Sequence, residues 1–280
     1  MEIKILEMME TRVKFLLSQS SPEVANALRR VLMSEVPKMA IDNVEFHLGP
    51  IMDEEGKEYE SVSPLFDEIV AHRLGLVPIP TDLQLFVERS KCTCGGEGCP
   101  SCTIMYSLNK KGPCEVYSGD LEPLGDARFR VKDELIPIVR LGPGQAILVY
   151  ASAELGKGKE HAKWQVTSGT GYKYLPSVKI DYHRCDNGGR CIPVCPKHVF
   201  ERVEGKVKVV DEGSCIMCLA CTDLKICKTN AIKVDGDATR FVFEFETDGS
   251  LDAKTALIAA LNILEAKFEE FKDMVSALEN

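Results

Sequence analysis

The sequence is short of positive charge. Among its 280 residues, 34 are lysine or arginine and 43 are aspartate or glutamate, which gives a net charge of −9 at neutral pH. A protein that binds nucleic acid directly needs clustered positive charge to displace counterions from the phosphates. We therefore expect no direct contact between this chain and DNA or RNA.

Long apolar runs are also missing. No stretch reaches the roughly 20 consecutive apolar residues that a transmembrane helix needs. The first segment, MEIKILEMMETRVKFLL (1–17), has acidic residues from its start and no small-residue cleavage site, which is unlike a secretory signal peptide. These features predict a cytoplasmic protein that does not contact a membrane.

Catalytic motifs are equally scarce. The sequence contains no nucleophile elbow, dinucleotide-binding fingerprint or HExxH motif, and its acidic residues are scattered. The segment LGKGKEH (155–161) has the glycines of a phosphate loop, but it lacks the spacing to Gly-Lys-Ser/Thr and no strong helix pattern follows it. We expect a folded protein, since 45% of the residues are hydrophobic, with no catalytic residues of its own.

Cysteine, in contrast, is abundant. The chain has twelve cysteines, and in a cytoplasmic protein these are not expected to form disulfides. Eleven of them fall into three groups, which favours metal binding. Cys114 stands apart from the groups, and we expect it to be a buried free thiol.

Two of the groups resemble the two runs of a bacterial ferredoxin, Cys-x2-Cys-x2-Cys-x3-Cys-Pro. They are CDNGGRCIPVCP (185–196) and CIMCLACTDLKICKTNAI (215–232). In the first run Gly188 occupies the place of the second cysteine. In the second run the last cysteine, Cys227, comes after five residues instead of three, and Lys228 replaces the usual proline.

The ferredoxin pattern predicts which cysteines share a cluster. In two-cluster ferredoxins the last cysteine of each run binds the cluster of the other run. Applied here, this rule assigns a complete 4Fe–4S site to Cys195, Cys215, Cys218 and Cys221. The second site receives only Cys185, Cys191 and Cys227, because Gly188 supplies no ligand.

Three thiolates match a 3Fe–4S cluster. A 4Fe–4S cluster at the second site would need water or another side chain on its fourth iron, and Asp186 is the nearest oxygen donor in the sequence. An empty or oxidised second site is the alternative. Two zinc sites are disfavoured, because zinc usually pairs two Cys-x-x-Cys hairpins that are a dozen or more residues apart.

The third group, KCTCGGEGCPSC (91–102), has a different spacing. Its four cysteines lie within eleven residues, with three glycines between the pairs, at Cys92, Cys94, Cys99 and Cys102. Glycine permits the tight backbone that brings four sulfurs to about 2.3 Å from one ion. This pattern predicts a closed structural zinc site, with iron or a metal-free loop as the alternatives.

Two amphipathic helices are predicted in the first third of the chain. One spans 21–36, where Ser21 can cap the helix, Pro22 suits its first position and Pro37 follows its end. The other spans about 64–74. Apolar residues recur at helical spacing in both, at Val24, Ala27, Leu28, Val31 and Leu32 and at Leu65, Ile69, Val70 and Leu74.

The C-terminal region predicts a strand and then a long helix. RFVFEFE (240–246) alternates with Phe241, Phe243 and Phe245 on one face, as a half-buried strand does. A helix of about twenty residues is predicted from Asp252, and its apolar surface is wide enough to favour a partner helix. The middle of the chain, 104–175, is predicted to form mostly short strands between Gly/Pro turns. These strands and the predicted helices together indicate the α+β class.

Three further stretches resemble a known family. NALRRVLMSEVPKMAID (26–42), DEIVAHRLGLVPIPTD (67–82) and LGKGKEHAKWQV (155–166) resemble signatures of the archaeal RNA polymerase D subunits. That family is related to the bacterial alpha subunit and to the third-largest subunit of eukaryotic polymerase II. The loop CTCGGEGCPSC (92–102) is similar to the zinc loop of the eukaryotic relatives, and a ferredoxin-like insertion occurs in many archaeal members.

The resemblance implies an architecture of three parts. A discontinuous, alpha-subunit-like dimerisation domain would combine 1–46 with 236–280. A mostly β insertion domain with the zinc loop would span 47–176, and a ferredoxin-like iron–sulfur domain would span 177–235.

The resemblance also implies a function in transcription. The chain would be a non-catalytic platform of DNA-directed RNA polymerase that forms a heterodimer with the small alpha-like subunit L, recruits the large catalytic subunits and meets other small subunits. Contacts with the second-largest subunit would be made by Arg29, Arg30, His72, Arg73, Lys157, Lys163 and Trp164.

Other functions compete with this one. The cysteine runs taken alone favour a ferredoxin-like electron-transfer protein, but they span only about a fifth of the chain, and no flavin or nicotinamide motif accompanies them. A free-standing metal-dependent scaffold or sensor is a third possibility. Within a polymerase, the clusters would either stabilise a small domain with little core of its own or regulate assembly by redox change.

Overall fold

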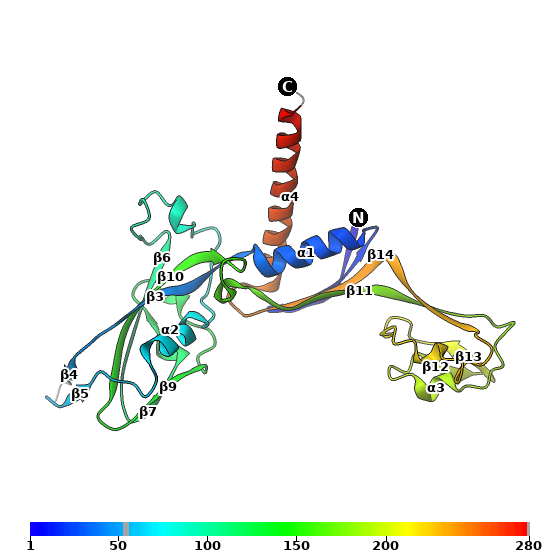
Figure 1. The fold of residues 1–280 in the computed structure, drawn as a ribbon, viewed down its shortest axis with the longest axis horizontal. Coiled ribbons are helices and arrows are strands. Elements are labelled where there is room, and N and C mark those ends of the chain that lie inside the picture. The colour runs from blue at the N-terminus through cyan, green and yellow to red at the C-terminus, as the bar shows by residue number, and fades with distance from the viewer. Residues whose placement is uncertain (53–55, 279–280) are drawn as a thin grey trace. The chain divides into compact units, whose positions relative to one another are not determined.

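The computed structural model describes residues 1–52 and 56–278, which form a mixed α+β fold (Figure 1). Its α-helices are α1 (Pro22–Ser34), α2 (Asp67–Gly75), α3 (Cys191–Val194) and α4 (Ala253–Ala277). Its strands are β1 (Glu2–Met8), β2 (Arg12–Ser18), β3 (Pro37–Phe46), β4 (Pro50–Met52), β5 (Glu58–Glu60), β6 (Thr103–Lys111), β7 (Cys114–Tyr117), β8 (Glu122–Pro123), β9 (Pro137–Leu141), β10 (Ala146–Lys157), β11 (Thr167–Ile180), β12 (Phe200–Val203), β13 (Lys206–Val209) and β14 (Ile232–Thr247).

The chain forms two compact units, each built from segments that are separate in the sequence. Unit 1 comprises Met1–Leu6, Lys14–Asn26 and Gly171–Glu244, and unit 2 comprises Glu7–Val13, Ala27–Thr170 and Phe245–Asn280. The α+β class predicted from the sequence is confirmed. No helix in the described parts of the chain is long and apolar enough to span a membrane.

The strands of unit 1 belong mainly to a four-stranded sheet in the order β1-β2-β14-β11. The predicted alternation in β14 is confirmed, because Phe241, Phe243 and Phe245 are fully buried. The rings of Phe15 and Phe243 stack with their centroids 5.1 Å apart. Tyr172 of β11 packs against the same aromatic group, so aromatic side chains from three neighbouring strands hold this sheet together.

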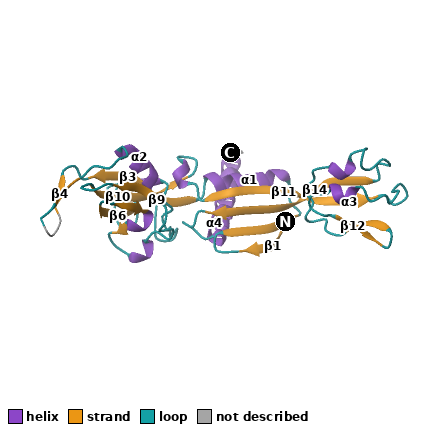
Figure 2. Ribbon diagram, turned by 90° about the horizontal axis from the view of Figure 1, so that it is seen from below, coloured by secondary structure: helices purple, strands orange, loops and turns teal. Residues whose placement is uncertain are grey.

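Between β11 and β14 lies the cysteine-rich part of unit 1. It contains only short regular elements, namely α3, β12 and β13, joined by loops (Figure 2). The β12–β13 hairpin pairs Phe200 with Val209. Its small apolar core includes Phe200, Val207 and Ile232 together with buried cysteines. This region therefore has only a small apolar core of its own.

Unit 2 is built on a second four-stranded sheet, in the order β3-β10-β6-β8. The long strand β10 pairs antiparallel with both β3 and β6. Its core contains Met39, Ile41 and Tyr106 from the sheet and Val70 and Leu74 from α2. The sheet and α2 thereby fix the loops that carry the cysteine group at 92–102.

The middle of the chain was expected to contain mostly short strands, and β7, β8 and β9 are short, whereas β10 and β11 are not. Strand β10 has 12 residues and β11 has 14. Gly171 and Pro176 lie inside β11. Because β11 is an edge strand of its sheet, proline is tolerated there.

Helix boundaries also differ from the prediction. α1 buries Ala25, Leu28, Val31 and Leu32, whereas Val24 is 40% exposed at the border of the buried face. α2 begins at Asp67 rather than Pro64, and it buries Val70 and Leu74. Ile69 is exposed, since one helical residue turns the side chain by about 100° away from that of Val70.

Helix α4 has two distinct halves. Asp252 caps it by accepting a hydrogen bond from the backbone N–H of Thr255 at 2.8 Å, and Ala253, Ala256, Leu257 and Ala260 are buried. From 265 to 278 every residue is exposed. This exposed half carries large apolar side chains, at Phe268, Phe271, Met274, Val275 and Leu278.

Candidate metal centres and subunit contacts

The loop that follows Arg89 gathers four cysteines around one point. The Sγ atoms of Cys92, Cys94, Cys99 and Cys102 all lie within 4.8 Å of one another. Cys92 and Cys99 are 3.5 Å apart, Cys94 and Cys102 are 3.7 Å apart, and Cys99 and Cys102 are 3.8 Å apart. This four-cysteine cluster is able to bind a metal.

Glycine makes this loop possible. Gly95, Gly96 and Gly98 have φ angles of 69°, 88° and 97°, in the region that favours glycine. The turns aim backbone N–H groups at sulfur. The N–H of Gly98 and then the thiol of Cys92 stabilise the thiolate of Cys94 and lower its pKa to about 6. The loop is therefore prepared to present negative charge to a cation.

Some of the sulfur separations can be compared with those around a single tetrahedral ion. A tetrahedral zinc ion with Zn–S bonds of about 2.3 Å places its sulfurs about 3.8 Å apart. Three of the sulfur pairs are 3.5, 3.7 and 3.8 Å apart, and all pairs lie within 4.8 Å. An iron–sulfur cube would hold its four thiolates further apart, because each binds a different iron.

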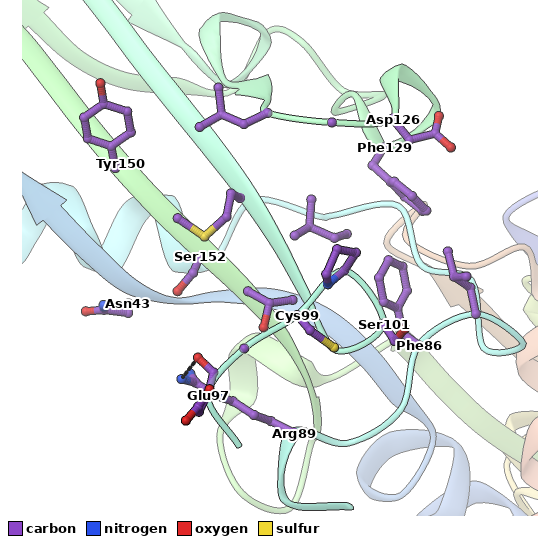
Figure 3. Close-up of a pocket in the computed structure, with 18 of the residues that line it drawn as sticks. Asn43, Phe86, Arg89, Glu97, Cys99, Ser101, Asp126, Phe129, Tyr150 and Ser152 are labelled. Atoms are coloured by element: carbon purple, nitrogen blue, oxygen red, sulfur yellow. Dashed lines mark hydrogen bonds between the residues drawn. The ribbon is translucent and has the colours of Figure 1, made fainter. Parts of the chain in front are cut away.

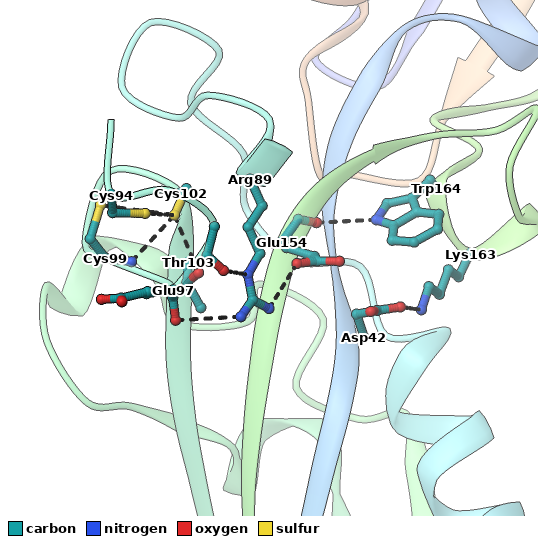
Figure 4. A network of polar contacts seen from close by, with 11 residues as sticks. Asp42, Arg89, Cys94, Glu97, Cys99, Cys102, Thr103, Glu154, Lys163 and Trp164 are labelled. Atoms are coloured by element: carbon teal, nitrogen blue, oxygen red, sulfur yellow. Dashed lines mark hydrogen bonds and ion pairs between the residues drawn. The ribbon is translucent and has the colours of Figure 1, made fainter. Parts of the chain in front are cut away.

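Arg89 ties this loop to the sheet of unit 2 (Figure 4). Its guanidinium donates to the backbone carbonyls of Gly96 at 2.8 Å and Glu97 at 3.4 Å, and to the carboxylate of Glu154 on β10 at 3.2 Å. The Trp164 indole donates to the backbone carbonyl of the same Glu154. Glu154 therefore connects the 92–102 loop with the 155–166 segment.

An open groove of about 620 Å³ lies beside the loop (Figure 3). Its lining includes Asn43, Met105 and Ser152 of the unit 2 sheet, Cys99 of the metal loop and Phe129. The cysteine cluster therefore also forms part of the wall of this groove.

The first ferredoxin-type set lies around one cavity. Cys195, Cys215, Cys218 and Cys221 all line it, together with apolar residues such as Val199, Ile216, Leu219 and Val234. Burial, and then the charges of Cys215, Cys195 and Cys218, raise the pKa of Cys221 to about 11. The sequence rule that brings Cys195 across from the other run therefore matches the lining of this cavity.

The second set is also brought together. Burial, followed by the neighbouring charges of Cys185, Cys227 and Asp186, raises the pKa of Cys191. Cys191 and Cys227 are buried, and Cys185 is half-buried.

Cys114, which was expected to be a buried thiol, is half-buried, and its Sγ lies 3.2 Å from the backbone oxygen of Lys111.

Seven residues were expected to contact a large subunit, and unit 2 brings two of them to one recess. His72 and Lys163 line a recess of about 250 Å³ together with Asp42 and His161. Lys163 pairs with Asp42 and lies over the Trp164 ring.

The other five differ in their surroundings. Arg73 donates to the backbone oxygen of Ile138 at 2.7 Å, and Lys157 pairs with Glu88 at 2.8 Å. Trp164 is buried, whereas Arg29 is half-buried and Arg30 is exposed, both on α1.

Two structural pairs were missed by sequence reasoning. Lys38, only 3% exposed, pairs with Asp248, which is 210 residues away in the chain. Gly156 lies against the Trp164 indole so closely that a Cβ there would be 2.4 Å from the ring. Gly156 and Trp164 lie close together in the sequence, within the 155–166 segment, so this contact could have been suspected. The sequence gives no indication that Lys38 pairs with Asp248.

Comparison with known proteins assigns the family. The model of the RNA polymerase Rpb3/Rpb11 dimerisation domain matches residues 14–268. This chain belongs to the Rpb3/Rpb11 dimerisation-domain family of RNA polymerase subunits. The match includes all three cysteine groups and most of α4, so the metal-binding candidates lie within the span that the family model covers.

Individual relatives agree with this membership. The chain is 43% identical to the DNA-directed RNA polymerase subunit Rpo3 of Picrophilus torridus, over 98% of this chain and 99% of the relative. It is 45% identical to the Rpo3 of Thermoplasma volcanium over 94% and 95%, and 39% identical to that of Archaeoglobus fulgidus over 99% of both chains. Family membership over the whole chain favours the polymerase role over that of a free electron carrier.

Proposed function

We propose that this chain is the D-type assembly subunit of a DNA-directed RNA polymerase. The observation that carries the proposal is the family match across 14–268. The chain contributes no catalytic residues in this role. It holds other subunits in place so that the large subunits can form the active site.

The exposed half of α4 is the proposed dimerisation surface. Phe268 and Phe271 are 68% and 61% exposed, which is costly for phenylalanine in water. The side chains at 268, 271, 275 and 278 recur every three or four residues, as helix-in-groove contacts do. The proposed partner is the small alpha-like subunit L.

The second-largest subunit is proposed to dock on the basic residues of α1 and on the recess of unit 2. Arg30 and His72 are exposed and Lys163 is half-buried, so their side chains can reach a partner. Trp164 is buried, and in this proposal it acts by positioning Lys163.

Recruitment can be tested separately from dimerisation. The experiment is affinity purification of the chain after co-expression with the L-type and second-largest subunits. Arg30→Glu combined with His72→Ala is expected to retain L and to lose the second-largest subunit. Arg184→Ala, an exposed arginine in unit 1, serves as the control. Equal recovery of the second-largest subunit in all three proteins would contradict the proposed surface.

Zinc is the proposed occupant of the 92–102 loop. The tetrahedral sulfur spacing and the lowered pKa of Cys94 support a single divalent cation. Elemental analysis of the purified chain is expected to find about one zinc per chain, and Cys99→Ser with Cys102→Ser is expected to remove it. Zinc retained in that variant would exclude this loop as its site.

The two ferredoxin-type sets are proposed to hold iron–sulfur clusters in a domain at 177–235. The first set would hold a 4Fe–4S cluster through Cys195, Cys215, Cys218 and Cys221, and the second would use Cys185, Cys191 and Cys227. Each set also has a cysteine whose sulfur accepts a backbone hydrogen bond, since Val199 donates to Cys195 Sγ at 3.4 Å and Ala231 donates to Cys227 Sγ at 3.2 Å.

The role of these clusters is testable in the same assembly. Cys215, Cys218 and Cys221 are replaced by serine, and both heterodimer formation and recruitment are measured. Loss of recruitment with an intact heterodimer would support regulation of assembly, and collapse of the domain would support a structural role. If both processes survive unchanged, the clusters do not serve assembly, and reduction by a physiological donor then tests the electron-transfer alternative.

A further inference from the structure

The two cysteine runs fold into matching loops, although one lacks a cysteine. Each run has five residues between its first cysteine and the cysteine six positions later. Two positions after the first cysteine, Asn187 and Met217 have φ angles of 53° and 52°. Two positions further on, Gly189 and Leu219 have φ angles of 73° and 60°.

The ends of the two runs match as well. Three residues after the last cysteine, His198 and Asn230 have φ angles of 50° and 51°. One residue later, Val199 and Ala231 donate their N–H groups to the sulfur of that cysteine. Left-handed backbone at a non-glycine residue is uncommon, so this repetition places Gly188 at the position that Cys218 holds in the other run.

The residues between these cysteines differ at all five positions, and three alternating ones bear on the missing ligand. The complete run has Ile216, Cys218 and Ala220, and the incomplete run has Asp186, Gly188 and Arg190. An arginine therefore stands where the complete run has a side chain of one carbon. Gly188 lacks a left-handed φ, so its backbone does not require glycine.

The space in front of Gly188 is filled by an ion pair. A Cβ at Gly188 would lie 3.1 Å from Oδ1 of Asp186, 3.2 Å from Nη1 of Arg190 and 3.3 Å from its Cζ. Arg190 donates to Asp186 at 2.5 Å and to the backbone oxygen of Ile226 at 2.9 Å. Ile226 directly precedes Cys227, so the guanidinium is held between the Gly188 loop and a cysteine of the second set.

We propose that Arg190, oriented by Asp186, occupies the fourth-ligand corner of the second site and restricts it to a three-iron cluster. This inference rests on the proposed iron–sulfur function of the Cys185, Cys191 and Cys227 set. It assigns a task to two residues that are not themselves ligands.

The chemistry of the two side chains supports this assignment. A guanidinium has only N–H donors and no free electron pair, so it cannot bind iron, and its positive charge repels a fourth iron cation. Its N–H groups can donate to cluster sulfur instead. Asp186 could otherwise supply an oxygen ligand, but it accepts hydrogen bonds from Arg190 and from the N–H of Gly188 at 2.9 Å.

The test is iron and sulfide content with EPR after anaerobic loading of the full chain with ferrous iron and sulfide. The wild type is expected to bind about seven irons and to show the signal of an oxidised three-iron cluster. Gly188→Cys with Arg190→Ala supplies a thiolate and clears the corner, so we expect about eight irons and loss of that signal. Arg190→Ala alone, which frees Asp186, is expected to bind more iron than the wild type.

A matched arginine variant and the signal of the first cluster serve as controls. Arg184→Ala removes an exposed arginine just before Cys185 and is expected to match the wild type. The 4Fe–4S signal of the first site reports that each variant is folded. Wild-type iron content in both Arg190 variants, or about eight irons in the wild type, overturns the inference. About four irons in the wild type overturns it as well, whereas failure of the polymerase role would appear separately as lost copurification.

Discussion

Among single residues, Gly156 is fitted to Trp164. A Cβ at position 156 would lie 2.4 Å from the buried indole, which neither the ring nor the backbone can avoid without a shift. Gly156→Ala is therefore expected to destabilise the protein by about 1–3 kcal/mol through overpacking. Urea unfolding measures the change, and Gly125→Ala is the control because a Cβ there has no neighbour within 4 Å. Equal midpoints for both variants would contradict this account of the 155–166 segment.

The buried pair of Lys38 and Asp248 is a second prediction for single residues. Asp248→Asn removes the negative charge but keeps an oxygen that can accept from Ser250. Because Lys38 is only 3% exposed, its unpaired ammonium should cost about 3–5 kcal/mol of unfolding free energy. Lys38→Met added to Asp248→Asn should recover much of this loss. A double variant no more stable than Asp248→Asn alone would show that the pair is not the cause.

Some features of the candidate sites could be predicted from single residues of the sequence, and others could not. The cysteine groups could be recognised from their short spacings, and Cys195, Cys215, Cys218 and Cys221 line one cavity. Their assignment as ligands of a 4Fe–4S cluster stays a prediction. The pairing of Asp248 with Lys38 could not be predicted from the sequence, because 210 residues separate them and no periodic pattern links them. The same holds for the contact between Arg89 and Glu154, which are 65 residues apart in the chain.

At the scale of elements, α4 is tied to Glu35, the residue that follows α1, within unit 2. The carboxylate of Glu35 accepts from Lys267 of α4 at 2.8 Å and from Lys159 at 3.4 Å. The hydrogen bond from Lys267, together with the charges of both lysines, keeps the pKa of Glu35 below its usual value of 4.5. This pair contributes stability while Glu35 is ionised.

The lowered pKa gives a pH dependence with a definite sign. Since the folded pKa lies below the unfolded value of 4.5, the contribution is present above pH 4.5 and is lost as the pH falls through the folded pKa. Wild type should exceed Glu35→Gln in stability by about 1 kcal/mol at pH 7, and the gap should close under acid. Thermal unfolding across pH measures it. A gap that does not change with pH would exclude this ion pair as its source.

Elements differed in how well their sequences predicted them. The phenylalanines of β14 alternate without interruption, so period-two reasoning found the strand. Gly171 and Pro176 are unfavourable residues for the interior of a strand, yet β11 continues through both. Proline is tolerated there because β11 lies at the edge of its sheet. Ile69 seemed to belong to the buried stripe of α2, but the stripe is narrow, since the helix packs only Val70 and Leu74 into the core of unit 2.

For the whole molecule, the distribution of exposed apolar surface indicates an incomplete assembly. The exposed half of α4 has five large apolar side chains, at Phe268, Phe271, Met274, Val275 and Leu278. The sequence predicts a partner helix, because the apolar surface of α4 is wider than one face. Membership in a dimerisation-domain family agrees with that expectation. A partner on this surface would bury what the isolated chain leaves in water.

The most direct measurement is the mass of the complex that forms when the chain is purified with the small alpha-like subunit. Native mass spectrometry should find one copy of each subunit for the wild type. Phe268→Glu with Phe271→Glu should abolish the complex, while Leu135→Glu, which changes another exposed apolar residue, should leave it intact. A wild-type chain that stays alone, or an α4 variant that binds as well as the wild type, would contradict the assembly role proposed for this protein.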